Sequence, residues 1–150
     1  MDQKFNIIIG QGIGPANFGM TEDEIIELFG KPDETDDDKD SHTKTYFYDN
    51  ILCDFVFEQN PETNAYTLVS ALTTNPDYAI DNKIHLGDSE QDLIKYTKTL
   101  KAEPPEIETD ESTHERYLYF DDLNMIAIFD NEGLATVQIG IWDEDEESEN

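Results

Sequence analysis

The segment Gly19–Ile26 reads GMTEDEII, and the chain repeats it as Gly87–Ile94, which reads GDSEQDLI. The two segments align without a gap at an offset of 68 (87 − 19). A second pair, Ser41–Ile51 and Thr113–Leu123, aligns at an offset of 72 (113 − 41). The extra four residues fall in the loop between the paired segments, where insertions cost little free energy. The sequence therefore contains an internal duplication of a unit that combines a helix with strands.

Each copy of the repeat has a signal for the start of a helix. Thr21 followed three residues later by Glu24 forms a capping box, and Ser89 begins a looser version of the same pattern. Apolar residues then recur at helical spacing, and glycine or proline follows each run. We expect helices from Thr21 to Phe29 and from Ser89 to Leu100. Both are short, so packing on a sheet has to stabilise them.

Three strands are predicted after each helix, because β-branched and aromatic residues alternate with polar ones between turn signals. They cover residues 44–48, 52–58 and 66–73 in the first copy, and 115–120, 124–130 and 135–142 in the second. A leading strand is expected at residues 4–9 and another at 83–86. The predicted fold is α+β, with two tandem β-α-β-β-β repeats and an antiparallel sheet that carries the helices on one face. Residues 1–80 and 81–142 form the two predicted units.

Two acidic stretches interrupt this pattern. Residues 33–40 lie between the first helix and its hairpin, and residues 143–150 end the chain with the sequence DEDEESEN. Blocks of like charge repel one another and resist folding. We therefore expect the first stretch to be a mobile loop and the second to be a disordered acidic tail.

Composition limits the function classes. The chain has 150 residues, 37% of them hydrophobic, and a formal net charge of −27. This charge repels nucleic acid and anionic lipid, and attracts basic proteins or cations. No apolar run approaches the roughly 20 residues that cross a bilayer, so we expect a cytoplasmic protein without a membrane partner. The single cysteine, Cys53, rules out an internal disulfide and a zinc site built on several cysteines.

Aromatic residues mark the candidate binding surface. Tyr46 and Tyr48 in the first copy, and Tyr117 and Tyr119 in the second, alternate along strands that the repeat makes equivalent. Ordinary sheet packing is one explanation. The other is an aromatic platform on the open sheet face, or on the concave side if the facing is reversed, because tyrosine supplies binding energy at interfaces. The residues expected at the edges of that platform are Asp36, Asp37, Asp38 and Trp142.

Catalytic and metal signals are weak by comparison. His42 and His114 hold equivalent positions before each hairpin, within acidic surroundings that could supply further metal ligands. Nothing in the sequence orients a third ligand, so surface histidines are the favoured interpretation. No nucleophile elbow, metal-binding histidine pair or calcium-loop spacing is present. We expect no cofactor, no metal and no enzymatic activity.

One motif resembles a known family. The phrase Gly12–Thr21 (GIGPANFGMT), followed by Gly30-Lys31-Pro32, resembles an opening found in bacterial proteins whose helix and strands are similar to the repeats of the β-lactamase inhibitory protein. It is also similar to the single repeat of small outer-membrane assembly lipoproteins, whose lipid-attachment cysteine this sequence lacks. The second copy keeps only Gly87, Ser89 and the hairpin pattern. The resemblance implies a helix packed on antiparallel strands and a binding or inhibitory role, and no inhibitor contact residue matches.

Three function classes follow. The first is a non-catalytic protein-binding inhibitor, such as an immunity protein that neutralises a basic toxin. The second is a DNA mimic or acidic adaptor protein. The third is a small ligand-binding protein or an enzyme whose site the sequence does not reveal. The charge, the repeat and the aromatic residues favour the inhibitor.

Overall fold

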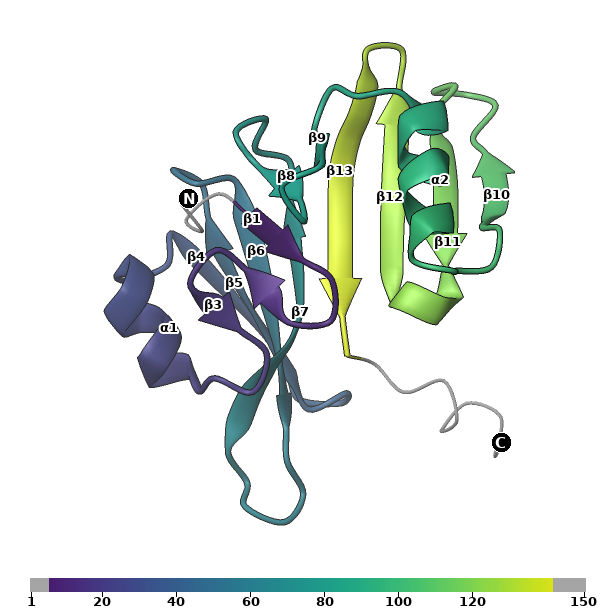
Figure 1. Cartoon of the computed structure of the whole chain (residues 1–150). Helices are drawn as coiled ribbons and strands as arrows, with labels where there is room; N and C mark the ends of the chain where they lie inside the picture. The colour runs from purple at the N-terminus through teal and green to yellow at the C-terminus, as the bar shows by residue number, and fades with distance from the viewer. Residues whose placement is uncertain (1–5, 142–150) are drawn as a thin grey trace.

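The computed structural model describes residues 6–141, which form two sheets and two α-helices (Figure 1). The first half holds β1 (Asn6–Ile8), β2 (Gly12–Ile13), β3 (Ala16–Asn17), α1 (Glu22–Phe29), β4 (Glu34–Asp38), β5 (Thr43–Tyr48), β6 (Cys53–Gln59) and β7 (Tyr66–Thr73). The second half holds β8 (Ala79–Ile80), β9 (Ile84–His85), α2 (Glu90–Thr99), β10 (Glu106–Thr109), β11 (Arg116–Phe120), the 3-10 helix η2 (Asp121–Leu123), β12 (Met125–Asp130) and β13 (Gly133–Gly140). The predicted α+β class is confirmed.

The larger sheet has eight antiparallel strands in the order β10-β11-β12-β13-β7-β6-β5-β4. Each copy of the repeat supplies four consecutive strands, and the last strands of the two copies, β7 and β13, pair at the centre. The predicted unit had only three strands after its helix. The additional strands are β4 and β10, which lie at the two outer edges.

Backbone hydrogen bonds show how closely the two copies agree. The amide of Gly19 donates to the carbonyl of Leu68 at 2.9 Å, and the amide of Gly87 donates to the carbonyl of Leu134 at 2.8 Å. Both glycines have a positive φ, of 98° and 103°, which an L side chain rarely adopts. The final strands therefore align at an offset of 66 (134 − 68).

A pseudo-two-fold axis follows from this offset. Leu72 becomes equivalent to Gln138 (72 + 66), and these two residues are direct cross-strand partners between β7 and β13. Two equivalent strands that pair antiparallel are related by a half-turn. The axis therefore passes through the sheet between Leu72 and Gln138.

The smaller sheet has the order β3-β2-β1-β8-β9. The β2–β3 hairpin precedes α1, the β8–β9 hairpin precedes α2, and β1 lies between them. The pairing of β1 with β8 is parallel, whereas the larger sheet is antiparallel throughout, as predicted. The glycine-rich stretch after β1 contains β2 and turns back as a hairpin.

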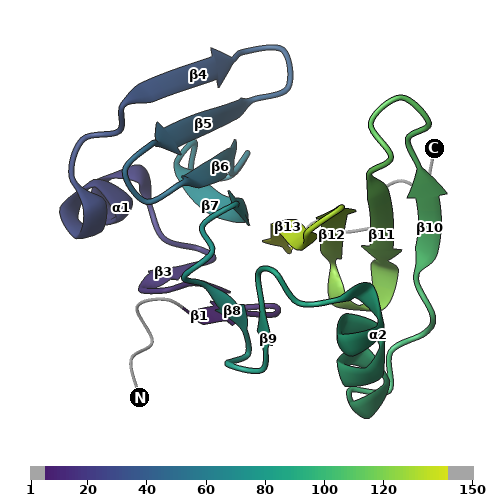
Figure 2. The ribbon, with the colours of Figure 1, turned by 90° about the horizontal axis from the view of Figure 1, so that it is seen from above.

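Both helices and the smaller sheet lie on one side of the larger sheet (Figure 2). The predicted caps are present: the Thr21 side chain accepts from the Glu24 amide at 3.3 Å, and the Ser89 side chain accepts from the Asp92 amide at 3.1 Å. Each helix buries a fully enclosed aliphatic residue against the sheet layer, Ile25 in α1 and Leu93 in α2. Together with alternate residues of the large sheet they form one core, whose largest enclosed sheet side chains are Tyr48, Phe55, Phe57, Leu68, Leu118, Phe120 and Met125.

The acidic stretch after α1 was expected to be mobile, and this expectation is wrong for Glu34–Asp38. These five residues form β4 and pair in register with β5, from Glu34 opposite Phe47 to Asp38 opposite Thr43. Every one of the five is exposed. An edge strand keeps its carboxylates in water, so like charges do not prevent it from pairing.

Two predicted features lie outside the described residues: Trp142, and the acidic tail at residues 143–150. Within residues 6–141, neither helix has the length and apolar content that a bilayer crossing requires.

Candidate binding surface on the open sheet face

The structure separates the four candidate tyrosines. Tyr46 and Tyr48 point toward α1 and are buried, with 7% and 2% of their surface exposed. The Tyr48 hydroxyl donates to the carbonyl of Gly30 at 2.8 Å, and its ring contacts Phe29 at a centroid distance of 5.6 Å. Desolvation by burial, with a smaller effect from the charge of Asp33, raises the pKa of Tyr48 to about 12. Neither Tyr46 nor Tyr48 is available to a partner on the open face.

Tyr117 and Tyr119 lie on the opposite side of the sheet, which carries no helix. Their neighbour Leu118 is buried, whereas both tyrosines are half-buried. The Tyr119 hydroxyl donates to a carboxylate oxygen of Glu108 at 3.0 Å, and this hydrogen bond raises the pKa of Tyr119. These residues border a shallow hollow of about 460 Å³, lined by Glu108, Thr109, Asp110, Tyr117 and Tyr119.

The offset of 72 between the two hairpins explains the separation. It makes Tyr46 equivalent to Leu118 (46 + 72), whereas Tyr117 is equivalent to Thr45. Successive side chains of a strand point to opposite faces, so a difference of one position reverses the facing. The hypothesis of a four-tyrosine platform did not take this one-position difference into account, and it is wrong for Tyr46 and Tyr48. The repeat alignment itself carried the signal that could have corrected it.

The side of the larger sheet that faces away from the helices is called the open face below. No helix and no other strand of residues 6–141 covers it (Figures 1 and 2). Its centre is rich in half-buried apolar and aromatic side chains: Phe47, Val56, Val69, Leu72, Tyr117, Tyr119, Ile126 and Ile128. The set includes the two tyrosines that the sequence predicted and six residues that it did not.

Acidic residues border the open face at both edges. Glu34, Asp36 and Asp38 on β4 are paired with outward residues of β5, and so share their face. Glu106 and Glu108 on β10 are the partners of Tyr119 and Tyr117. Of the predicted Asp36–Asp38 group, Asp37 is the exception, because it pairs with Lys44 and points to the helix side.

One row of direct cross-strand partners runs across the whole open face, one residue from each strand. In order from β4 to β10 it reads Glu34, Phe47, Asp54, Leu72, Gln138, Ile126, Tyr119 and Glu106. The row begins and ends with a glutamate, and each glutamate is followed inward by an aromatic residue. The Leu72–Gln138 pair stands at its middle, on the pseudo-two-fold axis. This row is called the cross-sheet row below.

Asp54 is the one carboxylate in the inner part of the cross-sheet row. Partial burial, and to a smaller extent the negative charge of Asp49, raise the pKa of Asp54 above its ordinary value. The equivalent residue in the second copy is Ile126 (54 + 72). The two halves of the open face therefore differ in charge near the centre and agree at the margins.

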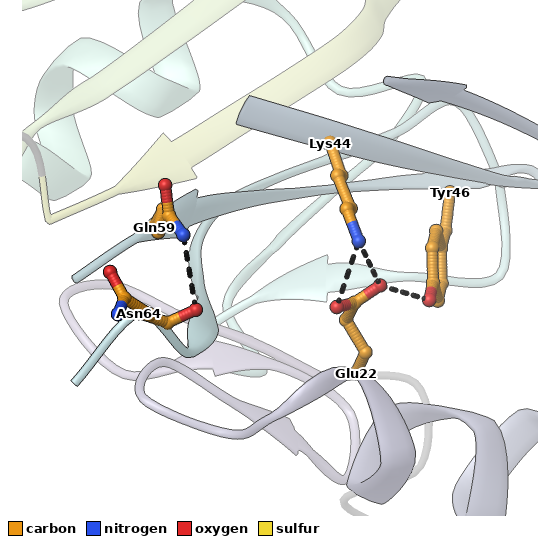
Figure 3. Close-up of polar contacts among 5 residues, drawn as sticks. All are labelled: Glu22, Lys44, Tyr46, Gln59 and Asn64. Carbon is orange, nitrogen blue, oxygen red and sulfur yellow. Dashed lines mark hydrogen bonds and ion pairs between the residues drawn. The ribbon is translucent and has the colours of Figure 1, made fainter. Parts of the chain in front are cut away.

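A polar cluster on the helix side fixes α1 to β5 (Figure 3). Glu22 accepts hydrogen bonds from Lys44 at 3.4 Å and from the Tyr46 hydroxyl at 2.5 Å. The Lys44 ammonium also lies 4.3 Å from the ring centre of Tyr66. Figure 3 includes a neighbouring loop contact, in which the Gln59 side chain donates to the Asn64 carbonyl at 3.2 Å.

The second copy has an equivalent ion pair, with arginine in place of lysine. Arg116 corresponds to Lys44 (44 + 72) and Glu90 to Glu22 (22 + 68), and the guanidinium donates two hydrogen bonds to that carboxylate, at 2.7 and 3.0 Å. The recurrence in both copies identifies the pair as a structural brace between helix and sheet. Each brace therefore uses one of the few cationic side chains of the protein to hold a helix against the sheet.

The remaining reactive groups do not converge. His42 and His114 have positive φ angles, of 58° and 64°, and lie in exposed turns beside β4 and β10, at opposite edges of the larger sheet. Within residues 6–141, no three His, Cys, Asp or Glu side chains are arranged to hold a metal ion. Cys53 is buried, and burial raises the pKa of its thiol. A thiol in that state reacts slowly.

Comparisons with known proteins give one structural similarity. No protein-family model matches the chain, and no curated protein matches it in sequence. The crystal structure of a DUF4309 family protein (YjgB) from Bacillus subtilis is similar to it with a TM-score of 0.45 and 16% sequence identity. The similarity covers 87% of this chain and 82% of the other.

Proposed function

We propose that this protein is a non-catalytic inhibitor that binds a basic protein over its open face, as an immunity protein binds a toxin. The resemblance of the Gly12–Thr21 motif to proteins with repeats like those of the β-lactamase inhibitory protein supports an inhibitory role. The observation that carries the proposal is the cross-sheet row, which has glutamates at both ends and, between them, four apolar or aromatic residues beside Asp54 and Gln138.

The apolar centre supports binding because a solvated sheet face is ordinarily polar. Antiparallel strands with one face in water alternate apolar inward residues with polar outward ones. On β12 both alternating sets are apolar, since Ile126 and Ile128 point outward while Met125, Ala127 and Phe129 are buried. Contiguous exposed apolar surface on a soluble protein is typical of an interaction site. Tyrosine is one of the residue types enriched among those that supply most of the binding energy of an interface.

The acidic margins support a basic partner. Carboxylates around an apolar centre attract lysine and arginine side chains at the partner's rim and speed its diffusional encounter. The net charge of −27 adds a long-range field of the same sign. The same field disfavours nucleic acid, whose phosphates carry like charge. We therefore infer a protein partner and no nucleic-acid partner.

Co-expression tests this function. Cells that express a basic toxin domain encoded by a neighbouring gene are expected to grow when this protein is present. Tyr119→Ser and Ile128→Glu are expected to abolish the rescue, because both alter the open face away from the core. The matched control is Leu100→Ser, at an exposed apolar residue beyond the end of α2. Circular dichroism establishes that all variants are folded.

Purified complexes give a second measurement. Glu108→Gln is expected to slow association and to reduce its dependence on ionic strength, because rim charges act mainly on the association rate. Equal rescue by Tyr119→Ser, Ile128→Glu and the wild type would exclude the open face as the binding site. Substrate turnover that a single substitution abolishes would contradict a non-catalytic role, and tight binding to duplex DNA at 0.15 M salt would contradict the basic-protein partner.

A further inference from the structure

The two copies of the repeat give the open face two half-sites with corresponding margins, although Asp54 and Ile126 differ between them. The offset of 72 relates Glu34 to Glu106, Asp36 to Glu108 and Phe47 to Tyr119. It also relates Val56 to Ile128. Each half-site therefore has two carboxylates at the margin, an aromatic ring next to them and a β-branched side chain further in. None of these positions lies in the buried core, so packing of the core does not require their agreement.

The half-sites are placed by the pseudo-two-fold axis. In the cross-sheet row, Phe47 and Tyr119 stand two strands outward from Leu72 and Gln138 respectively. Five strand spacings of about 4.8 Å put the two aromatic residues roughly 24 Å apart along the sheet. Because equivalent strands run antiparallel, the half-sites point in opposite directions along the strands, and the twist of the sheet turns their outward directions apart symmetrically about the axis.

We propose that the partner is a two-fold-symmetric basic protein, a homodimer that sits with its axis over the Leu72–Gln138 pair. Each of its subunits would place an apolar residue flanked by arginine or lysine on one half-site. One copy of this chain would then bind one partner dimer. A monomeric partner could engage the two half-sites only through two different surfaces, whereas a dimer presents the same surface twice in the required orientation.

This inference rests on the proposed function, and bivalence makes it separately testable. Two linked binding groups gain affinity over one, because the second contact is intramolecular, typically by about 100-fold or more. The gain requires a linker that spans the two half-sites. A flexible Gly/Ser linker of about 20 residues has a root-mean-square length of roughly 24 Å, which matches the estimated separation.

The experiment uses three synthetic probes and isothermal titration calorimetry at low salt. The first is the peptide Arg-Leu-Arg-Leu-Arg, the second is two such peptides joined by that Gly/Ser linker, and the third is the first with serine in place of leucine. The single peptide is expected to bind the wild type with a stoichiometry of two. The linked peptide is expected to bind with a stoichiometry of one and an affinity at least tenfold higher. The serine peptide measures the contribution of charge alone and is subtracted.

Matched variants assign the half-sites. Phe47→Ser and Tyr119→Ser are each expected to reduce the stoichiometry of the single peptide from two to one and to remove the gain of the linked peptide. Leu100→Ser is the control and is expected to change neither. A stoichiometry of one for the single peptide, sensitive to only one of the two variants, would overturn the two-half-site proposal while leaving a single binding face. Binding no tighter than that of the serine peptide, or unaffected by both variants, would overturn the binding face itself.

Discussion

Gly133, at the start of β13, lies directly against the backbone of Gly87, just before α2. A Cβ atom at position 133 would stand 2.7 Å from the carbonyl carbon of Gly87 and 2.8 Å from the carbonyl oxygen of Asp88. The φ of Gly133 is 115°, in a region that L side chains rarely adopt. This contact joins the entrance of the second helix to the last strand, so the backbone cannot easily move away.

Gly133→Ala is therefore expected to lower the free energy of unfolding by about 3 kcal/mol, from steric overlap together with backbone strain. Urea denaturation followed by circular dichroism measures the loss. Gly10→Ala is the matched control, because Gly10 also has a positive φ of 81° but has open space where a Cβ atom would stand. Its expected cost is about 1 kcal/mol, from strain alone. Equal losses in the two variants would refute the close backbone contact.

The Lys44–Glu22 brace gives a second prediction. Both side chains are about three-quarters covered, with 27% and 25% exposed, so the pair is shielded but not fully desolvated. A double-mutant cycle with Lys44→Met and Glu22→Gln is expected to give a coupling energy of about 0.5–1 kcal/mol. The coupling should weaken in 1 M NaCl, because salt screens partly exposed charges. A coupling energy of zero at low salt would show that the Lys44–Glu22 pair does not help to hold α1 against the sheet.

Tyr48→Phe isolates the hydrogen bond between the sheet and the end of α1. Loss of the bond to the Gly30 carbonyl is expected to cost about 1 kcal/mol at neutral pH. The pKa of Tyr48 is raised to about 12, so its contribution is complete below its unfolded value near 10 and is lost as the pH rises through 12. The difference between wild type and variant should therefore shrink between pH 10 and pH 12. A constant difference across that interval would show that the hydroxyl does not titrate as the structure predicts.

Asp54→Asn tests the partly buried charge on the open face. The pKa of Asp54 is raised in the folded protein, so folding favours the protonated form. The protonated Asp54 side chain makes its full contribution to the free energy of unfolding below the unfolded pKa near 3.9. That contribution is lost as the pH rises through the pKa of the folded protein. The variant is expected to be more stable than the wild type at pH 7, with the advantage vanishing near pH 3. Asp37→Asn is the control for removing one charge from a strongly acidic protein, since Asp37 is exposed on β4. An equal gain in the free energy of unfolding in both variants would show that the effect comes from the lower net charge and not from the partial burial of Asp54.

The repeat in the sequence determined much of this fold. The GMTEDEII and GDSEQDLI segments predicted both helices and their caps, because a cap depends only on residues three positions apart. Alternation predicted β5, β6 and β7 and their equivalents β11, β12 and β13, because that pattern reports one buried face. Short-range sequence patterns were therefore sufficient to predict these helices, caps and strands, because each of them depends on residues that are close together in the chain.

Tertiary structure decided which residues share a surface. The sequence grouped Tyr46 and Tyr48 with Tyr117 and Tyr119, whereas pairing within the sheet sends the first two to the core and the last two to the open face. Pairing with β5 also makes a strand, β4, of the acidic stretch that the sequence pattern predicted to be mobile. An edge strand tolerates these charges because its side chains stay in water. The cross-sheet row depends on eight strands in one register, which no local pattern encodes, since each partner comes from a different part of the chain.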